Sequence, residues 1–471
     1  MKLKPCIYYL GLSCFPISIM ALLNIFYSFY FDYLLNIQTY IAVLFLSLIV
    51  GFNLYNFGKK EKENINIFEQ IFTILLIYFL ISFFIQIPFY FSEYKVSFLE
   101  SYFESISGLT GTGFTIFENI RFLDDPILLW RSSSQWIGGL YFLIFLVLIF
   151  SNKQLNFKLL DLTYNQENKI NFAPNLRIVS TRIFFIYLTL TILIFVIFLL
   201  SGIRLFDGLN LTMTVISSGG FLPTDSLDNI IKTNYQSVSL SLGFIISILN
   251  FYLLYNLFLK RENLKDHKED LYIIISIFVF TMIFYLLSDF NILQSLLTVL
   301  SSISNSGISI TSIPNNYGLY FITLTIIGGC VLSSTSGIKF LRIYILVKGF
   351  LIEIYRLVQP NVILNNKIMF SDKKITNEII KISFIVFILF FISIFLLSGI
   401  LLVDFLDFEN SFKLSILTLT NTVSSDIYSM EKIEFVNLSS FSKISIILFM
   451  VVAKVELISI FILIQKVFIK N

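Results

Sequence analysis

Ten apolar segments set the strongest limit on what this chain can fold into. Each is about 20 residues or longer, the length that an α-helix needs to cross the hydrocarbon core of a bilayer. They run over 7–31, 38–57, 68–92, 126–150, 180–203, 235–259, 271–288, 318–347, 380–403 and 441–466. Charged residues make up only 13% of the chain, against about 25% in a soluble domain. Because helices of this length satisfy their own backbone groups in lipid, we expect an all-α integral membrane protein.

Lysine and arginine residues are divided unevenly between the two sides that these spans imply. If the N-terminus lies in the cytoplasm, 24 of the 33 fall in cytoplasmic segments and eight in outer loops, while Lys454 falls within the last span. Cytoplasmic loops of membrane proteins carry the excess of positive charge. The distribution therefore predicts that both termini are cytoplasmic. We interpret the first apolar segment as a retained span rather than a signal peptide.

After two leading spans in residues 1–62, one pattern recurs four times. Each unit holds a span, a short half-hydrophobic helix, a turn rich in Ser, Thr and Gly, a polar outer loop and a returning span. The units are 63–160, 161–268, 269–360 and 361–471, and their short helices and turns fall within 103–114, 209–221, 296–308 and 414–426. Irregular backbone at membrane depth is stable only where protein buries it or where it lines a watery path. The recurrence predicts four turns in a pseudo-fourfold arrangement around one pore; the alternative is that their small residues only pack helices together.

The first turn has the chemistry of a cation site. Thr110, Gly111 and Thr112 add little bulk around the backbone, and Gly113 can adopt φ > 0. The negative C-terminal end of a short helix, followed by free carbonyl groups, can hold a dehydrated cation inside a membrane. The three cysteines and the single histidine offer neither a disulfide framework nor the spacing of a transition-metal site.

Three motifs within this framework resemble the Trk/Ktr/HKT superfamily of potassium transporters. Residues 103–113 (FESISGLTGTG) are similar to its first filter loop, and residues 129–139 (LWRSSSQWIGG) to the helix that follows. Residues 328–339 (GGCVLSSTSGIK), with Arg342, are similar to its third returning helix. The two extra leading spans resemble the bacterial TrkH/TrkG branch, and the resemblance covers essentially the whole chain. It implies a potassium uptake permease, with K⁺ as the transported ion and no covalent cofactor.

The resemblance also implies where and with what such a permease works. We expect a multi-pass protein of the bacterial inner membrane, a homodimer with one pore per protomer, and no nucleic acid partner. The implied partner is a cytosolic nucleotide-binding regulatory subunit of the TrkA type. No glycine-rich nucleotide motif follows a strand pattern in this chain, so we expect NAD or ATP to bind the partner. Symport with H⁺ or Na⁺ and uncoupled flow both stay open.

In that superfamily, carbonyl groups just before one glycine per unit line the ion path. Matching positions give the ion-binding residues as Gly111, Thr112 and Gly113; Ser217, Ser218 and Gly219; Asn305, Ser306 and Gly307; and Thr422, Val423 and Ser424. In the fourth unit Ser424 stands where a glycine is expected, and its Cβ disfavours φ > 0. The alternative within this fold is therefore a sodium-permeable or weakly selective cation transporter.

Two features below the turns are candidates for a gate. The stretch 328–337 is too rich in small residues for a straight helix in lipid and predicts a loop inside the bundle. The resemblance implies that such a loop gates the flow of ions, with Gly328, Gly329, Ser333, Ser334, Thr335 and Gly337 as its gate residues. Lys454 lies near the middle of the last span, where a charge is costly and usually functional. It stands where the family has an arginine in a Gly-Arg-x-Glu motif. The alternatives are a tight helix crossing for the stretch and a carboxylate partner for the lysine.

A multi-spanning glycan polymerase or glycosyltransferase is the alternative from another class. Such an enzyme needs a large polar outer loop, or carboxylates and an arginine that hold a sugar phosphate. The outer loops expected here are short. No paired acidic and basic constellation is expected to face outward except at Asp404, Asp407 and Glu409, which lead into the fourth short helix. We therefore expect a permease rather than an enzyme.

Overall fold

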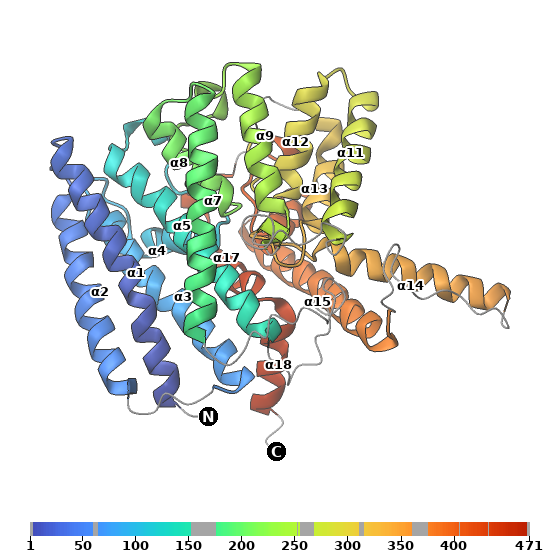
Figure 1. The fold of residues 1–471 in the computed structure, drawn as a ribbon, viewed down its shortest axis with the longest axis horizontal. Coiled ribbons are helices and arrows are strands. Elements are labelled where there is room, and N and C mark those ends of the chain that lie inside the picture. Colours follow the sequence, from blue (N-terminus) through green and yellow to red (C-terminus); the bar gives the residue numbers. More distant parts are fainter. Residues whose placement is uncertain are drawn as a thin grey trace.

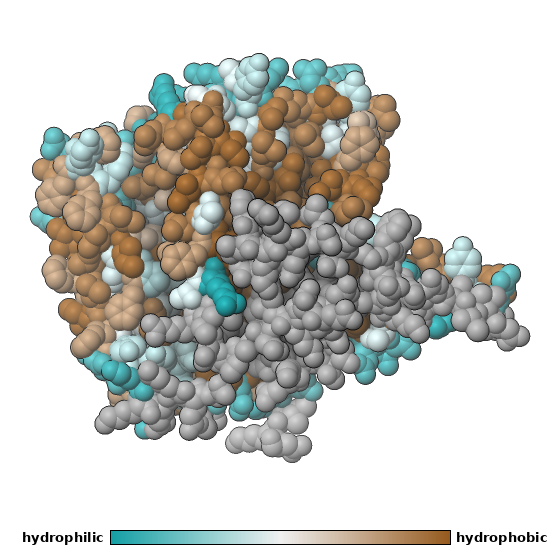
Figure 2. All heavy atoms as spheres, viewed as in Figure 1, coloured by the Kyte–Doolittle hydropathy of each residue, from teal (hydrophilic) through white to brown (hydrophobic). Residues whose placement is uncertain are grey.

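Every regular element in the described part of the chain is a helix. The computed structural model describes residues 3–59, 65–151, 176–251, 253–254, 268–309, 315–359, 375–404, 406–431 and 433–468. Within them, six helices are long and apolar enough to cross a membrane. Figure 2 shows apolar side chains over the flank of the molecule and hydrophilic ones gathered at its upper end. The prediction of an all-α membrane protein is confirmed.

Two leading helices form an antiparallel pair, α1 (Leu3–Tyr30) and α2 (Ile37–Gly58), at one edge of the bundle (Figure 1). Small residues let their backbones approach closely. A Cβ added to Gly11 of α1 would lie only 2.8 Å from the carbonyl oxygen of Gly51 on α2. Farther along the pair, the hydroxyl groups of Ser18 and Ser47 are hydrogen-bonded at 2.7 Å. The N- and C-terminal ends lie on the same side of the molecule.

The remaining helices fall into four groups in chain order. The first is α3 (Ile67–Tyr90), α4 (Phe98–Thr110) and α5 (Asp125–Ser151), and the second is α7 (Leu176–Leu200), α8 (Leu205–Ile216) and α9 (Asn234–Ile248). The third is α11 (Lys268–Leu287), α12 (Ile292–Ile303), α13 (Gly318–Ile327) and α14 (Phe340–Val358). The fourth is α15 (Asn377–Leu401), α16 (Phe408–Leu419), α17 (Ser440–Lys454) and α18 (Leu457–Phe468). Short 3₁₀ turns lie at Ile120–Phe122, Leu227–Asn229, Asn315–Tyr317, Leu402–Asp404, Asp426–Tyr428 and Phe435–Asn437.

The short helices α4, α8, α12 and α16 each pack on a helix of the preceding group. Helix α5 contacts α8, α9 contacts α12, and α13 contacts α16. Helix α17, near the end of the chain, contacts α4 of the first group and so closes the cycle. The four groups therefore follow one another in a ring, with each short helix held between its own group and its neighbour.

Local sequence explains why the short helices begin and end where they do. Helix α4 begins with a capping box in which Ser97 and Glu100 satisfy each other's backbone N–H groups, and it ends at Gly111, which has φ of 78°. Helix α12 begins with a capping box between Asn291 and Gln294. A left-handed residue just past a helix is the usual way to stop it. Each short helix thus ends part-way through the bundle by local signals.

Two of the predicted spans are broken. The span expected over 318–347 is split into α13 and α14 by a loop from Gly328 to Lys339, and that over 441–466 is split at Val455 and Glu456. Gly328 and Glu456 both have positive φ, which an α-helix cannot accommodate. The loop agrees with the composition of 328–337, whereas hydropathy alone gave no sign of the break after Lys454. The span expected over 235–259 also departs from prediction, because α9 ends at Ile248.

Candidate functional site

Each short helix is followed by a residue in the left-handed conformation. These residues are Gly111 (φ 78°), Ser218 (φ 56°), Asn305 (φ 61°) and Asn421 (φ 47°). A Ser or Thr precedes each of them: Thr110, Ser217, Ser304 and Thr420. Asn tolerates this conformation better than most side chains. The four turns therefore share a left-handed residue at this position, although only the first uses glycine there.

Hydrogen bonds repeat from turn to turn and fix the register among them. The residue after the left-handed one donates its backbone N–H to a carbonyl within the short helix in three turns: Thr112 to Ser107 (3.0 Å), Gly219 to Thr214 (2.8 Å) and Thr422 to Leu417 (2.9 Å). The hydroxyl groups of Ser107, Thr214 and Ser301 donate to the carbonyl oxygens of Phe114, Phe221 and Ile308, at 2.6, 2.8 and 2.6 Å. By these bonds the counterparts of Gly113 are Gly220, Gly307 and Val423.

This register corrects the alignment made from sequence in two of the four turns. Gly219 and Ser424 were expected at the level of Gly113, but each lies one position away from it. The second turn contains two adjacent glycines, Gly219 and Gly220, so its sequence alone does not show which of them corresponds to Gly113. In the fourth turn no glycine is present to align. Ser424 is the counterpart of Phe114, and a valine stands at the glycine position.

The four turns meet inside the bundle. A Cβ added to Gly113 would lie 2.7 Å from the Cα of Gly220, and one added to Gly220 would lie 3.1 Å from the carbonyl oxygen of Ser306. A Cβ added to Gly307 would lie 2.9 Å from the carbonyl oxygen of Val423. Gly113, Gly220 and Gly307 therefore have no room for side chains of their own. Turns separated by about a hundred residues in sequence are thus brought against one another.

Side chains also link one turn to the next. Asn305 donates through Nδ2 to Oγ1 of Thr422 at 3.3 Å, and Asn421 donates through Nδ2 to Oγ1 of Thr112 at 3.0 Å. Ser218 is hydrogen-bonded to Ser334 of the loop between α13 and α14, at 2.9 Å. All of the residues expected at the ion path are therefore in this cluster, and all but Val423 and Ser424 are buried.

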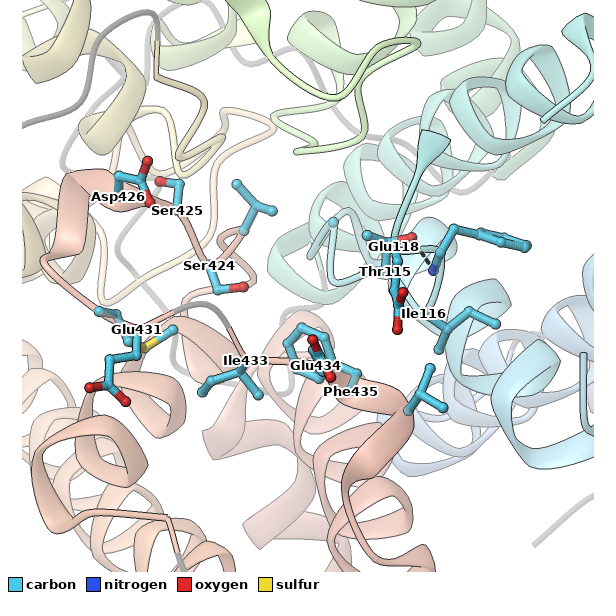
Figure 3. Close-up of a pocket in the computed structure, with 15 residues that line it drawn as sticks. Thr115, Ile116, Glu118, Ser424, Ser425, Asp426, Glu431, Ile433, Glu434 and Phe435 are labelled. Atoms are coloured by element: carbon cyan, nitrogen blue, oxygen red, sulfur yellow. Dashed lines mark hydrogen bonds between the residues drawn. The ribbon is translucent and has the colours of Figure 1, made fainter. Parts of the chain in front are cut away.

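A cavity of about 160 Å³ opens onto the cluster between the first and fourth turns. Gly113 and Val423 are among its lining residues, and Ser424 points into it (Figure 3). Its wall carries the acidic side chains of Glu118, Asp426, Glu431 and Glu434, and among the described residues that line it none is a lysine or arginine. Carboxylates around a concave surface raise the local concentration of cations. The cavity is therefore an electronegative approach to the turns.

On the other side of the turns, the loop from Gly328 to Lys339 is held by backbone contacts. Cys330 donates its N–H to the carbonyl oxygen of Ile248 at the end of α9, and Phe251 donates its N–H to Leu332, at 3.1 and 2.8 Å. Val331 donates its N–H to the carboxylate of Glu269 at 2.9 Å. Two carboxylates at the start of α11, Glu269 and Asp270, are buried against this loop. The predicted gate residues thus form an ordered loop packed between α9 and α11.

Lys454 is 3% exposed and lies between this loop and the first turn. Its Nζ is 3.4 Å from Oγ of Ser336 and 4.4 Å from the ring centre of Phe142. A Cβ added to Gly111 would lie 3.6 Å from the same nitrogen. No carboxylate within the described residues lies at salt-bridge distance from it, so the alternative of an ion pair finds no support there. Glu456, by contrast, pairs with Arg342 at 2.6 Å.

Comparison with known proteins decides the family. A family model described as TrkH, cation transport protein, matches residues 36–267. An uncharacterized cation transporter of Methanocaldococcus jannaschii is 28% identical over 389 residues, covering 81% of this chain and 79% of that protein. The Trk system potassium uptake protein TrkH of Escherichia coli is 25% identical over 354 residues, covering 70% and 72%. The crystal structure of the potassium transporter TrkH from Vibrio parahaemolyticus has the same fold, with a TM-score of 0.88 over the full length of both chains at 20% identity.

The chain belongs to the TrkH family of cation transport proteins. TrkH proteins are transporters, not enzymes, so the alternative of a glycan polymerase or glycosyltransferase is excluded. A TrkH-family chain with this many apolar helices is a multi-pass membrane protein.

Three residues that support the turns in this TrkH-family chain were missed from the sequence. Glu104 and Arg131 form a buried ion pair at 2.9 Å, with exposures of 0% and 1%. Arg131 also donates to Oγ1 of Thr115 at 3.0 Å, and its guanidinium lies 4.2 Å from the ring centre of Phe221. Gln135 accepts the N–H of Phe221 at 3.2 Å. The spacing Trp-Arg…Gln-Trp in residues 129–139 was a signal for Arg131 and Gln135, but the partners of all three residues lie in other segments.

A second buried lysine of the TrkH-family chain was also missed as a candidate. Lys339 is 2% exposed, donates to the carbonyl oxygen of Thr335, and lies 5.5 Å from the ring centre of Phe142. Phe142 therefore has two ammonium groups over its ring, from Lys339 and Lys454. The charge count had placed Lys339 and Arg342 in a cytoplasmic loop, whereas both are buried beside the loop between α13 and α14.

Proposed function

We propose that this chain is a potassium uptake permease whose four turns line a single ion path. The observation that carries the proposal is the meeting of turns from all four helix groups at one place, where Gly220 approaches Gly113, Ser306 and Val423. The cyclic packing of the short helices supports a pseudo-fourfold order of units 63–160, 161–268, 269–360 and 361–471 around that path. Relatives named as potassium uptake proteins support K⁺ as the ion.

Ion selection follows from the backbone of the turns. Four short helices direct their negative C-terminal ends toward the cluster, and carbonyl groups of the turns replace the water shell of a cation. The residues that we assign to this filter are those expected from sequence at 111–113, 217–219, 305–307, 422 and 423; Ser424 is left out, because the hydrogen-bond register makes it the counterpart of Phe114. The structural register adds Gly220 to them. The electronegative cavity supplies the filter with cations from the side opposite the two termini.

Below the filter, the loop 328–337 and Lys454 are proposed to gate the path. Gly328 and Gly337 both have positive φ, so the loop can adopt backbone conformations that a helix cannot. Lys454 holds a positive charge next to Gly111, with only a hydroxyl and an aromatic ring as described partners. An unpaired positive charge in a membrane path raises the barrier to cations. Displacing the loop and the lysine together opens the path.

The same proposal includes the orientation of the permease, its membrane and its protein partners. Both termini lie on one side of the molecule, which supports the cytoplasmic orientation derived from lysines and arginines (Figure 1). We assign the protein to the bacterial inner membrane, with a TrkA-like cytosolic subunit as its regulator. Helix α14 projects from the bundle and exposes Phe350, Tyr355 and Leu357, which supports a homodimer contact there. Symport with a second ion is compatible with this arrangement.

A sodium-permeable or weakly selective transporter is the second candidate. The observation that favours it is Val423, which breaks the series Gly113, Gly220 and Gly307 at one level of the filter. Selective carbonyl sites depend on the number and geometry of oxygens around the ion, and a bulky side chain alters both.

Cation uptake by bacterial cells that lack their own potassium uptake systems tests the proposal. Expression of the chain is expected to give Rb⁺ uptake that K⁺ inhibits, and growth at low external K⁺. Inhibition by Na⁺ as strong as that by K⁺ would instead identify the weakly selective transporter. No uptake above the vector control, with the chain present in the membrane fraction, would contradict the proposal.

A further inference from the structure

The fourth turn places a side chain at a level where the other three turns have none. Hydrogen bonds align Val423 with Gly113, Gly220 and Gly307. The isopropyl group of a valine at this level has to occupy space that the three glycines leave open. The position of the isopropyl group therefore decides how wide the ion path is at the level of Gly113.

The Val423 side chain reaches two other turns at once. A Cβ added to Gly220 would lie 2.5 Å from Cβ and 3.0 Å from Cγ1 of Val423, and one added to Gly307 would lie 3.0 Å from Cγ1 of Val423. Gly307 belongs to the neighbouring unit in the ring. Gly220 belongs to the second unit, which is not adjacent to the fourth in the packing of the short helices. Contact between non-adjacent units requires the side chain to extend across the centre of the cluster.

Hydrogen bonds on both sides of Val423 hold it in this place. Asn421 donates to Oγ1 of Thr112 and to the carbonyl oxygen of Met450, at 3.0 and 3.1 Å. On the other side, Ser425 donates its hydroxyl to the carbonyl oxygen of Gly307 at 2.6 Å. The backbone of the fourth turn is therefore tied to the first and third turns. Val423 is a fixed part of the ring and not the tip of a free loop.

We propose that the Val423 side chain narrows the ion path at the level of Gly113 and sets both the rate of transport and its discrimination by ion size. The inference rests on the proposed function. A dehydrated cation needs oxygen ligands, and an aliphatic group provides none. The isopropyl group must rotate away from Gly220 for an ion to pass, and the space it yields admits a small cation more readily than a large one. Ser424, one position outward, lies in the acidic cavity and does not narrow the path.

The test compares Val423→Gly, Val423→Ala and the matched control Ser424→Gly in cells that lack potassium uptake. Initial rates of Rb⁺ and Na⁺ uptake are measured, with the amount of each protein in the membrane determined by immunoblot. Val423→Gly is expected to raise Rb⁺ uptake roughly tenfold, which corresponds to a barrier lowered by about 1.4 kcal/mol. The ratio of Rb⁺ to Na⁺ uptake should rise as well, because the larger ion gains more. Val423→Ala should fall between the wild type and Val423→Gly, and Ser424→Gly should leave rate and ratio unchanged.

The outcomes separate this inference from the function on which it rests. If the wild type transports Rb⁺ but both Val423 variants match its rate and its ratio, Val423 does not narrow the path. A change in Ser424→Gly without one in Val423→Ala would likewise overturn the inference and restore the alignment made from sequence. If Val423→Gly does not reach the membrane, Val423→Ala decides the result. Absence of uptake by the wild type would overturn the proposed function itself.

Discussion

The first and fourth turns share a left-handed residue after the short helix, Gly111 and Asn421, but they differ in their other residues and in their support. The first has glycine at both special positions, Gly111 and Gly113, and is backed by the ion pair of Glu104 with Arg131. The fourth has Asn421 and Val423 there and is tied instead to its neighbours by amide and hydroxyl groups. The comparison teaches that the shape of a turn in this ring is maintained by its contacts, and that glycine is required only where another backbone approaches.

Loss of the ion pair behind the first turn should give the largest effect. Arg131→Ala leaves Glu104 buried without its charge partner, which costs about 3–5 kcal/mol of stability. Thermal unfolding of the purified protein in detergent measures this loss. Arg121→Ala is the matched control, because Arg121 pairs with Asp225 at 3.0 Å on the surface, with an exposure of 66%. Its loss should cost about 1 kcal/mol or less. Equal destabilisation by the two variants would contradict the role given to the buried pair.

A methyl group at Gly113 should act in the opposite direction to truncation at Val423. Gly113→Ala places a side chain at a φ of 81° and brings its Cβ to 2.7 Å from the Cα of Gly220. Strain and overpacking of this kind cost about 1–3 kcal/mol each. Rb⁺ uptake is therefore expected to be lost in Gly113→Ala, whereas Val423→Ala increases it. Normal uptake by Gly113→Ala would show that the first turn does not line the path.

Removal of the Lys454 charge tests whether this residue, at the end of helix α17, obstructs the flow of cations beneath the first turn. Lys454→Ala should raise Rb⁺ uptake about tenfold, because a barrier of about 1.4 kcal/mol is removed. Lys454→Arg keeps the charge and is the control, with uptake near that of the wild type. Lower uptake in Lys454→Ala at unchanged protein level would mean that the lysine supports the structure instead of limiting flow.

The smallest effect is expected from loss of the hydrogen bond that joins Asn421 of the fourth turn to Thr112 of the first. Asn421→Ala removes hydrogen bonds to Thr112 and Met450 and should lower stability by about 1 kcal/mol. Asn421→Gly restores the freedom for a φ of 47° without restoring the bonds, so the difference between the two variants separates backbone strain from the lost contacts. Identical unfolding curves for wild type and Asn421→Ala would show that the link contributes nothing.

The architecture could be predicted from sequence because its signals are local. Apolar runs, a fourfold recurrence of short helices and turns, and the glycines of 328–337 each follow from the residues themselves. The register of the fourth turn could not be predicted in this way. The sequence alignment of the turns relied on glycine, and the fourth turn has valine, Val423, where the others have glycine. Only the backbone hydrogen bond that ends at Leu417, compared with the equivalent bonds of the other turns, shows this correspondence.

Buried charges were missed for a related physical reason. Lys339, Arg342 and Arg131 are compensated by groups distant in sequence, such as the carbonyl oxygen of Thr335 or the carboxylates of Glu456 and Glu104. A charge count assigns such residues to loops because it contains no information about partners. Only Lys454 was recognised, since an uninterrupted apolar stretch surrounds it.

Rubidium flux into proteoliposomes that contain the purified chain tests the central claim most directly. The account predicts uptake by the wild type and faster uptake by Lys454→Ala, both inhibited by K⁺, with none by Gly113→Ala. Uptake by neither the wild type nor Lys454→Ala above that of protein-free liposomes would contradict the claim that the four turns form an ion path.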